Sequence, residues 1–424
     1  MKRFFLFFLI AFFSCIVFFI GCIKEEPEEI ILRIGNAHPD RNSGIGAIVE
    51  RLTSEFSDAH PNVIIKIESL QNHVMNYAET DQLPDVFMRQ STPAVMNPLI
   101  EGGFLLGLNK NDFTDFHFLP GALETNEFNG ALYGIPATGH MWVIYVNRSL
   151  FERAGVPLPV TWEDITASVP RFRAIGIIPV VTNGLEGWPL SIFFDNIVHR
   201  INGDFDRNYN AITRRNNVRF TDPDFIQAAR YIQDLIRARV FNPNLTLSDY
   251  GDARYQFVNQ RAAMYMMGSW EMDIVENEEF SQSFRNNVDV IKFPEIRGGR
   301  GAANEPLLWF SDNFVVSANL GNKEAAFDYI KFLTERLGQY SWEMGAGIPA
   351  QKVEPQPTDS SLGKKLLQIS AEATLISGRV PGFAYGSGAF EQEHQNLMRL
   401  LCSLTITPEE FAQRLDAAAV DSML

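Results

Sequence analysis

The chain has 424 residues, of which 46% are hydrophobic, and its formal net charge at pH 7 is -15. This charge argues against a nucleic-acid partner, because an acidic surface is repelled by the phosphate backbone. The length and the hydrophobic content are sufficient for a large core divided between two lobes. No pattern recurs at the period of about 20 to 50 residues that marks solenoids and propellers.

The amino terminus has the pattern of an export signal. Lys2 and Arg3 precede an apolar run from Phe4 to Ile20 that only Ser14 interrupts. The run is almost as long as the roughly 20 residues that cross a bilayer, so an uncleaved membrane anchor is the alternative.

A cysteine at the end of this run favours cleavage. Gly21 and Cys22 resemble a bacterial lipobox, although Phe19 stands where leucine is usual. We expect residues 1–21 to be removed as a signal peptide and Cys22 to be lipidated. Residues 22–29 are then a charged tether that holds the protein to a membrane surface.

The residues after the tether predict a strand, a helix and a second strand. Residues 30–35 and 63–67 are short branched apolar runs, as in buried parallel strands, and apolar residues recur three and four apart from Ile45 to Phe56. Residues 84–88 predict a further strand, and residues 93–102 a further helix.

A second alternation of strands and helices begins near Trp142. A strand there precedes a helix that starts after Thr161, whose hydroxyl can form a capping box with Asp164. A strand at 177–181, a helix from Phe225 and a strand at 262–267 follow. Two such blocks predict an α/β protein with two lobes.

A series of sequence blocks runs through nearly the whole of the mature chain. Together they resemble family 1 extracellular solute-binding proteins (carbohydrate type) of bacterial ABC importers, in lipoprotein form. The blocks are Leu83–Phe87, Phe128–Pro136, Tyr145–Val156, Thr161–Ile165, Phe257–Trp270, Asn322–Thr334 and Gly347–Lys352.

The resemblance implies the type II periplasmic-binding-protein fold, in which two lobes with mixed, mostly parallel sheets flanked by helices face each other across a cleft. It assigns residues 30–138 and 313–344 to the amino-terminal lobe, and residues 142–311 and 345–424 to the carboxyl-terminal lobe. The chain would cross between the lobes near residues 137–141, 309–313 and 345–347.

The resemblance also implies ligand-binding residues, and a sugar ligand needs aromatic side chains to cover its C–H faces. Trp188 and Trp270 are the expected stacking residues, and Glu186 is the expected acid beside them. The alternatives are tryptophans that fill a lobe core and a glutamate on a solvated loop.

Further cleft residues follow from the same resemblance. Each also has a structural alternative, since polar residues at turns and hinges need no ligand to explain them. The expected contacts are His140, Asp312, Asn313 and Tyr385, together with Arg89, Gln90, Asn36 and Asp40 on the amino-terminal lobe.

The expected function is capture of a sugar or related polyhydroxylated solute outside the cytoplasmic membrane and its delivery to ABC permease transmembrane subunits, by a monomer without catalytic residues, metal or cofactor. A sensory binding lipoprotein is one alternative. Another is a surface glycoside hydrolase in which distant acids such as Asp85 and Glu186 converge. Glu391 and His394 share a helix face, which we interpret as solvated surface and not as a metal site.

Overall fold

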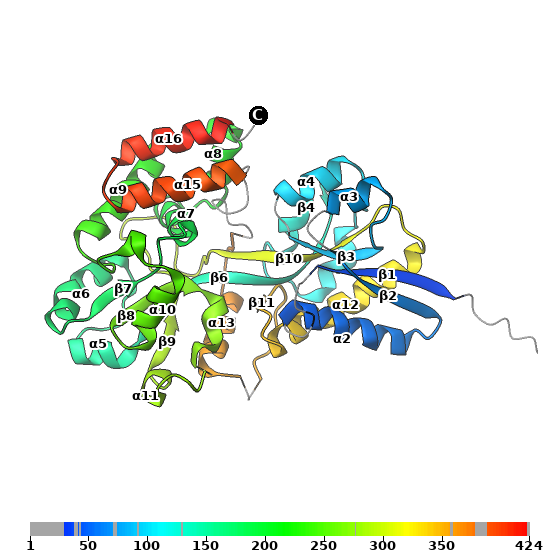
Figure 1. Ribbon diagram of the computed structural model, residues 1–424, viewed down its shortest axis with the longest axis horizontal. Coiled ribbons are helices and arrows are strands. Elements are labelled where there is room, and N and C mark those ends of the chain that lie inside the picture. The colour runs from blue at the N-terminus through cyan, green and yellow to red at the C-terminus, as the bar shows by residue number, and fades with distance from the viewer. Residues whose placement is uncertain are drawn as a thin grey trace, which may run out of the picture.

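Two α/β lobes lie side by side along the longest axis of the molecule (Figure 1). This computed structural model describes residues 29–37, 41, 44–70, 74–90, 93–128, 130–275, 277–356, 359–377 and 388–421. The predicted fold class, a two-lobed α/β protein with mixed sheets flanked by helices, is confirmed.

One path of paired strands runs through both lobes in the order β2-β1-β3-β10-β6-β8-β7. β1 is parallel to β2 and β3, and β7 is parallel to β8, whereas β6 and β10 are antiparallel to their neighbours. The short strands β9 and β11 also pair with β6. The bounds are β1 Ile30–Asn36, β2 Val63–Ser69, β3 Val86–Gln90, β6 Ile135–Asn147, β7 Ile178–Val181, β8 Ala262–Gly268, β9 Val288–Ile291, β10 Leu308–Val316 and β11 Ile348–Pro349.

In the amino-terminal lobe, helices cover both faces of the sheet because successive strand residues point to opposite sides. Val86 and Met88 of β3 pack in one apolar cluster with α2 (Gly44–Ala59) and α12 (Lys323–Glu343). Phe87 packs in another cluster with α3 (Val74–Glu79) and α4 (Pro93–Glu101). A small hairpin of β4 (Glu127–Phe128) and β5 (Ala131–Leu132) adjoins this lobe.

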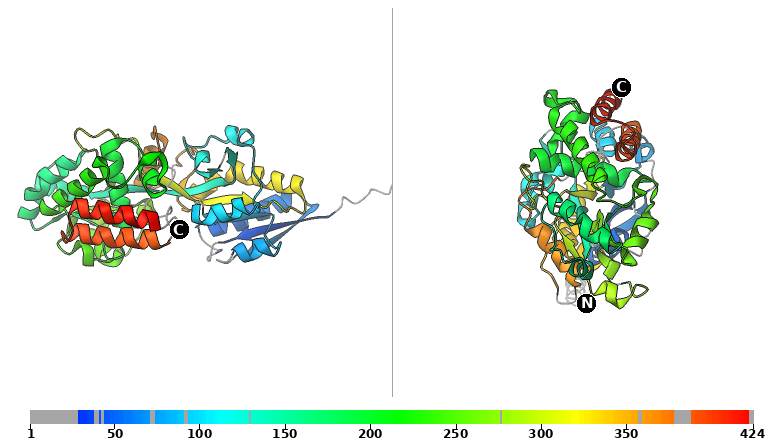
Figure 2. Two further views of the ribbon diagram at one scale, coloured as in Figure 1. Left: turned by 90° about the horizontal axis from the view of Figure 1, so that it is seen from above. Right: turned by 90° about the vertical axis from the view of Figure 1, so that its left-hand side faces the viewer.

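The carboxyl-terminal lobe holds most of the other helices. The capping box predicted at Thr161 and Asp164 is present at the start of α6. The terminal helices α15 and α16 lie side by side against α7 and α9 (Figure 2). The bounds are α5 Arg148–Ala154, α6 Trp162–Ala174, α7 Trp188–Asn202, α8 Asp206–Ile212, α9 Pro223–Arg237, α10 Tyr250–Val258, α11 Gln282–Arg285, α13 Ser361–Ala371, α15 Gly388–Cys402 and α16 Pro408–Asp421.

The long strands β6 and β10 connect the two lobes (Figure 1). Their pairing sets Trp309 opposite His140 and Phe310 opposite Gly139, and β11 pairs with Gly139 from its other side. A Cβ atom on Gly139 would lie 2.2 Å from the carbonyl oxygen of Trp309. Only glycine therefore permits this close approach of the strands.

Replacing Gly139 with alanine should destabilise the protein by about 1–3 kcal/mol, because the strands must separate to admit the methyl group. Urea unfolding of Gly139→Ala against the wild type measures the change. Gly107→Ala is the matched control, since a Cβ there would make an ordinary contact of 3.5 Å with Ala131. Equal midpoints for the two variants would contradict the prediction.

Candidate functional site

Five aromatic rings meet where the carboxyl-terminal lobe joins the crossing strands. The centroids of Trp188 and Trp270 are 5.7 Å apart, and those of Trp270 and Trp309 are 6.2 Å apart. The ring of His140 lies 5.3 Å from Trp270, and Trp142 lies 6.0 Å from both Trp188 and Trp270. We call this group the aromatic cluster: His140, Trp142, Trp188, Trp270 and Trp309.

The cluster forms because several chain segments end or cross at one place. His140 and Trp142 lie on β6, and Trp309 lies opposite His140 on β10. Trp188 begins α7, and Trp270 follows β8 directly. The carboxyl ends of the parallel strands β7 and β8 thus deliver Trp188 and Trp270 to the edge of the sheet where open α/β sheets bind ligands.

The rings of the cluster differ in their exposure. Trp142 is fully buried, whereas His140, Trp188, Trp270 and Trp309 are each partly exposed. Trp142 therefore supports the other rings from the core side. The four partly exposed rings offer the apolar surface that the C–H faces of a sugar require.

Gly268 gives Trp270 its place in the cluster. A Cβ atom on Gly268 would lie 2.1 Å from Cζ3 of the Trp270 indole, so the ring rests directly on this glycine. The carbonyl group of Gly268 accepts a hydrogen bond of 3.0 Å from the Tyr145 hydroxyl. The glycine therefore makes space for an indole at the end of the strand.

Glu186 lies on the loop between β7 and α7, two residues before Trp188. The Asn183 amide donates to its Oε2 atom at 2.7 Å, and the backbone N–H of Tyr250 donates to its Oε1 atom at 3.0 Å. Both carboxylate oxygens are therefore held within the protein, and the half-buried group keeps a defined orientation.

The crossing strands add polar groups next to the cluster. The Thr138 hydroxyl donates to Oδ2 of Asp312 at 2.9 Å, and the Asn126 amide donates to Oδ1 of Asn313. The Nδ1 atom of His140 is buried and has no hydrogen-bond partner among the described residues. Burial lowers the pKa of His140, while the negative charge of Asp312 acts in the opposite direction.

Asn36, one of the residues predicted as ligand contacts on the amino-terminal lobe, hydrogen-bonds within that lobe. Asn36 is buried, and its amide donates to the carbonyl of Gly46 at 3.1 Å and to Oε1 of Glu50 at 3.2 Å. Its amide is thus directed at α2 and not at the aromatic cluster.

Arg89 and Gln90 lie at the end of β3, where they pair with Asn313 and Asp312 of β10. The Nε atom of Arg89 is buried without a partner among the described residues, and burial lowers the pKa of this guanidinium. The backbone of Gln90 is described, but its side chain is not. Asp40, Tyr385 and Cys22 lie outside the described residues.

One of the interpretations made from the sequence needs correction. His394 is not on a solvated surface: it is 1% exposed and packs against Phe194 and Phe411, with centroids 5.7 and 6.3 Å away. The carboxylate of Asp85, which the hydrolase alternative pairs with Glu186, accepts hydrogen bonds from the backbone N–H groups of Arg33 and Gly321.

The residues expected from the sequence do not include Trp142 and Trp309, nor Tyr250 and Glu271, which hydrogen-bond to each other. The first two are separated by 167 positions, and only the pairing of β6 with β10 brings them together. The position of Trp142 after a predicted hinge crossing was the one signal in the sequence.

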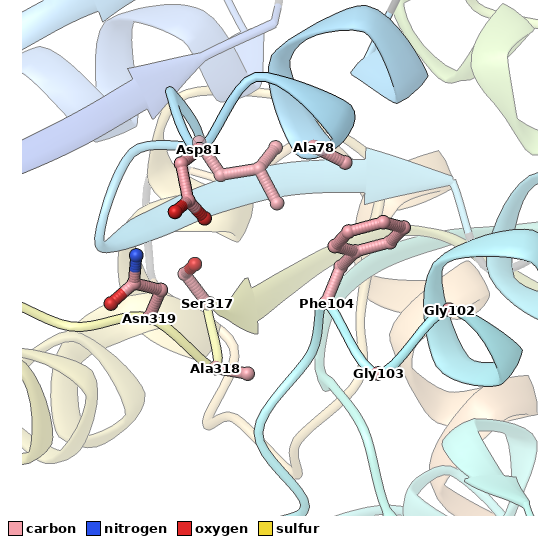
Figure 3. Close-up of a pocket in the computed structure, with 9 residues that line it drawn as sticks. Ala78, Asp81, Gly102, Gly103, Phe104, Ser317, Ala318 and Asn319 are labelled. Atoms are coloured by element: carbon pink, nitrogen blue, oxygen red, sulfur yellow. The ribbon is translucent and has the colours of Figure 1, made fainter.

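A separate hollow of about 180 Å³ lies on the amino-terminal lobe, away from the cluster (Figure 3). Phe104, Asp81, Ser317 and Asn319 are among the residues that line it. All its lining residues come from the amino-terminal lobe, and none was predicted as a ligand contact. The hollow and the aromatic cluster share no residue.

Comparison with known proteins gives a match that extends over most of the chain. The family model for "Bacterial extracellular solute-binding protein" matches residues 39–339. The chain is 20% identical over 302 residues to the multiple sugar-binding protein of Streptococcus mutans, with 68% of each chain covered. It is 25% identical over 275 residues to a sugar-binding periplasmic protein of Rhizobium meliloti, named as probable, and the match covers 63% of this chain and 62% of that protein.

Solved structures match over greater lengths. One, from a study of xylan utilization by Caldanaerobius polysaccharolyticus, is 25% identical with a TM-score of 0.71, and covers 92% of this chain and 99% of that chain. Another, described as a probable secreted solute-binding lipoprotein from Streptomyces coelicolor, has a TM-score of 0.78 at 18% identity and covers 93% and 99%. This second likeness shows the fold alone.

His140 should titrate below the pKa of about 6.5 that is usual for histidine, because burial disfavours its charged form. Replacing Asp312 with asparagine should lower the pKa of His140 further, since the carboxylate that favours the imidazolium is removed. NMR titration of the imidazole nitrogens, assigned with His140→Gln, measures both values. A wild-type pKa above 6.5, or an upward shift in Asp312→Asn, would contradict this account.

Proposed function

We propose that this protein captures a carbohydrate for an ABC importer, because the chain belongs to the family of bacterial extracellular solute-binding proteins. The observation that carries this proposal is the aromatic cluster with the held carboxylate of Glu186 beside it. Aromatic rings cover the C–H faces of a sugar, and a fixed carboxylate accepts hydrogen bonds from its hydroxyl groups. The relatives named as sugar-binding proteins support the same ligand class.

The proposed ligand contacts are arranged around the crossing strands. Trp188, Trp270 and Glu186 belong to the carboxyl-terminal lobe, and His140, Asp312 and Asn313 belong to the crossing strands. Arg89, Gln90, Asn36 and Asp40 would approach from the amino-terminal lobe, and Tyr385 from the segment before α15. Trp309 joins the set because its ring is partly exposed next to Trp270 and His140.

The proposed mechanism is closure of the lobes around the ligand. The lobes are residues 30–138 with 313–344 and residues 142–311 with 345–424. A ligand that touches both lobes only in the closed form binds that form more tightly and shifts the population towards it. The permease transmembrane subunits would then recognise the closed form of a monomer.

A hydrolase is not favoured. The relatives are binding proteins, and Asp85 uses its carboxylate to hold two backbone N–H groups within the amino-terminal lobe. A glycosidase would instead need two carboxyl groups at a set separation around one glycosidic bond.

We also propose that the protein is exported and anchored by a lipid on Cys22 after removal of residues 1–21. The family is extracellular, which agrees with an export signal at the amino terminus. In the part of the chain that the structure describes, no helix has the length and hydrophobicity needed to cross a bilayer. In this proposal the charged tether of residues 22–29 and its lipid hold the protein to the membrane.

Trp270→Ala should weaken sugar binding by about 1–3 kcal/mol, or roughly 5- to 150-fold in Kd, because the stacking surface is lost. The sugar is first identified by thermal shift in a panel of galactose, maltose, xylotriose and chitotriose, since a ligand that binds the folded state raises Tm. Calorimetry then gives the Kd of each variant.

Tyr255→Ala is the matched control, because Tyr255 is an aromatic residue that is 52% exposed on α10 and is not part of the cluster. Unchanged affinity in Trp270→Ala would remove Trp270 from the site. The absence of a thermal shift with every sugar in the panel would count against the carbohydrate proposal itself.

Cys22→Ser should move the protein from the membrane fraction to the soluble fraction of the exporting cell, because the acylated thiol is removed. Metabolic labelling with a radioactive fatty acid should mark the wild type and leave the variant unlabelled. Retention of the unlabelled variant in the membrane would indicate an uncleaved amino-terminal anchor instead.

A further inference from the structure

A buried carboxylate lies directly behind Trp270. Glu271 is 3% exposed, and Nε of Arg254 donates to its Oε2 atom at 2.9 Å. The hydroxyl of Tyr250 donates to its Oε1 atom, and the hydroxyl of Tyr265 approaches the same oxygen at 3.4 Å. A buried charge is tolerated only with such partners, and this carboxylate is too enclosed to touch a ligand. Its role must therefore lie within the protein.

Helix α10 supplies two of these partners from one face. Tyr250 and Arg254 are four residues apart and therefore project from the same side of the helix. The helix is fixed at its start, where the side chain of Asp249 accepts a hydrogen bond of 2.7 Å from the backbone N–H of Asp252. The positions of Tyr250 and Arg254 are thus set before they meet Glu271.

Tyr250 connects the two loops that carry the proposed ligand contacts. Its backbone N–H donates to Glu186 on the loop after β7, and its hydroxyl donates to Glu271 on the segment after β8. Burial and the charge of Glu271 raise the pKa of Tyr250, so the hydroxyl keeps its proton and remains a donor.

Trp270 is consequently held from several sides. Its ring rests on Gly268, where no side chain can fit, and its centroid lies 5.3 Å from that of His140 and 6.0 Å from that of Trp142. The next residue along the chain, Glu271, is bound to Arg254 and Tyr250. An indole with these constraints has little rotational freedom left to lose when a ligand stacks on it.

We propose that Tyr250, Arg254 and Glu271 form a positioning unit that fixes Trp270 and Glu186 relative to each other before the ligand arrives. This inference rests on the proposed function, in which Trp270 and Glu186 contact the sugar. The unit raises affinity through preorganisation, although none of its three side chains is a proposed ligand contact. Weakening it lowers affinity without removing a ligand contact.

The test uses Tyr250→Phe, which removes only the hydroxyl and keeps both the ring and the backbone N–H that holds Glu186. The full-length protein is labelled with 5-fluorotryptophan, and Trp270→Phe identifies the Trp270 resonance. We expect the Trp270 fluorine resonance to shift or broaden in Tyr250→Phe and to become more sensitive to added acrylamide. The resonance of Trp342, which lies near the end of α12 and is not part of the aromatic cluster, should stay in place.

Two control variants separate positioning from general loss of stability. Tyr255→Phe removes an exposed hydroxyl from the same helix and should change nothing. Tyr329→Phe removes a buried hydroxyl that hydrogen-bonds to Thr53 at 2.9 Å in the amino-terminal lobe. It should lower Tm and leave the Trp270 resonance unchanged.

Affinity is measured by calorimetry. The ligand is the sugar that gives the largest thermal shift among galactose, maltose, xylotriose and chitotriose. The Kd should rise about three- to tenfold in Tyr250→Phe, with Tyr255→Phe and Tyr329→Phe at the wild-type value. Glu271→Gln should change the Trp270 resonance in the same direction, because Arg254 loses its anion.

The outcomes distinguish the two proposals. An unmoved Trp270 resonance in Tyr250→Phe overturns the positioning unit, whatever the affinities are. The positioning unit is also overturned if the Trp270 resonance shifts in Tyr250→Phe but the Kd stays at the wild-type value, provided that Trp270→Ala does weaken binding. If no sugar in the panel binds the wild type, the carbohydrate function fails, and the fluorine spectra alone decide the positioning.

Discussion

The close pairing of β6 with β10 is the constraint on which the rest of the molecule depends. These strands belong to both lobes, and they approach so closely that Gly139 has no space for a side chain beside the carbonyl of Trp309. The same register sets His140 opposite Trp309. One backbone contact therefore both joins the lobes and places two rings of the aromatic cluster at the junction.

The remaining rings reach the junction because of ordinary α/β geometry. Trp188 and Trp270 follow β7 and β8, which are parallel neighbours, so their carboxyl ends open at one edge of the sheet. A glycine precedes Trp188, and another supports Trp270. A carboxylate held by Asn183 and Tyr250 stands next to Trp188. The site is thus made of rigid elements, and few of its described groups are free to turn.

Much of the fold was predictable because local patterns determine it. The capping box at Thr161 and Asp164, the periodic apolar residues of α2 and the apolar run of β8 are all local signals, and all three elements are present. Trp188 and Trp270 were each expected as stacking residues from the resemblance to the family, and their rings are neighbours in the structure. In contrast, the contact of Glu271 with Tyr250 and Arg254 depends on how α10 packs against the segment after β8. No spacing in the sequence encodes that packing.

The wrong assignment of His394 has a similar cause. His394 was assigned to solvent from its charged neighbours, but α15 turns it towards Phe194 and Phe411 when the terminal helices pack on α7. The environment of a polar residue thus depends on how the helices pack, and the spacing of residues in the sequence does not specify this packing.

The density of indoles at the junction also has an optical consequence. Trp142, Trp188, Trp270 and Trp309 form a chain of neighbours with centroids 5.7 to 6.2 Å apart. At such separations excitation energy passes between indoles far faster than light is emitted. A molecule bound against any one of these indoles would alter the fluorescence of the whole group. The protein therefore has an intrinsic fluorescent probe where its lobes meet.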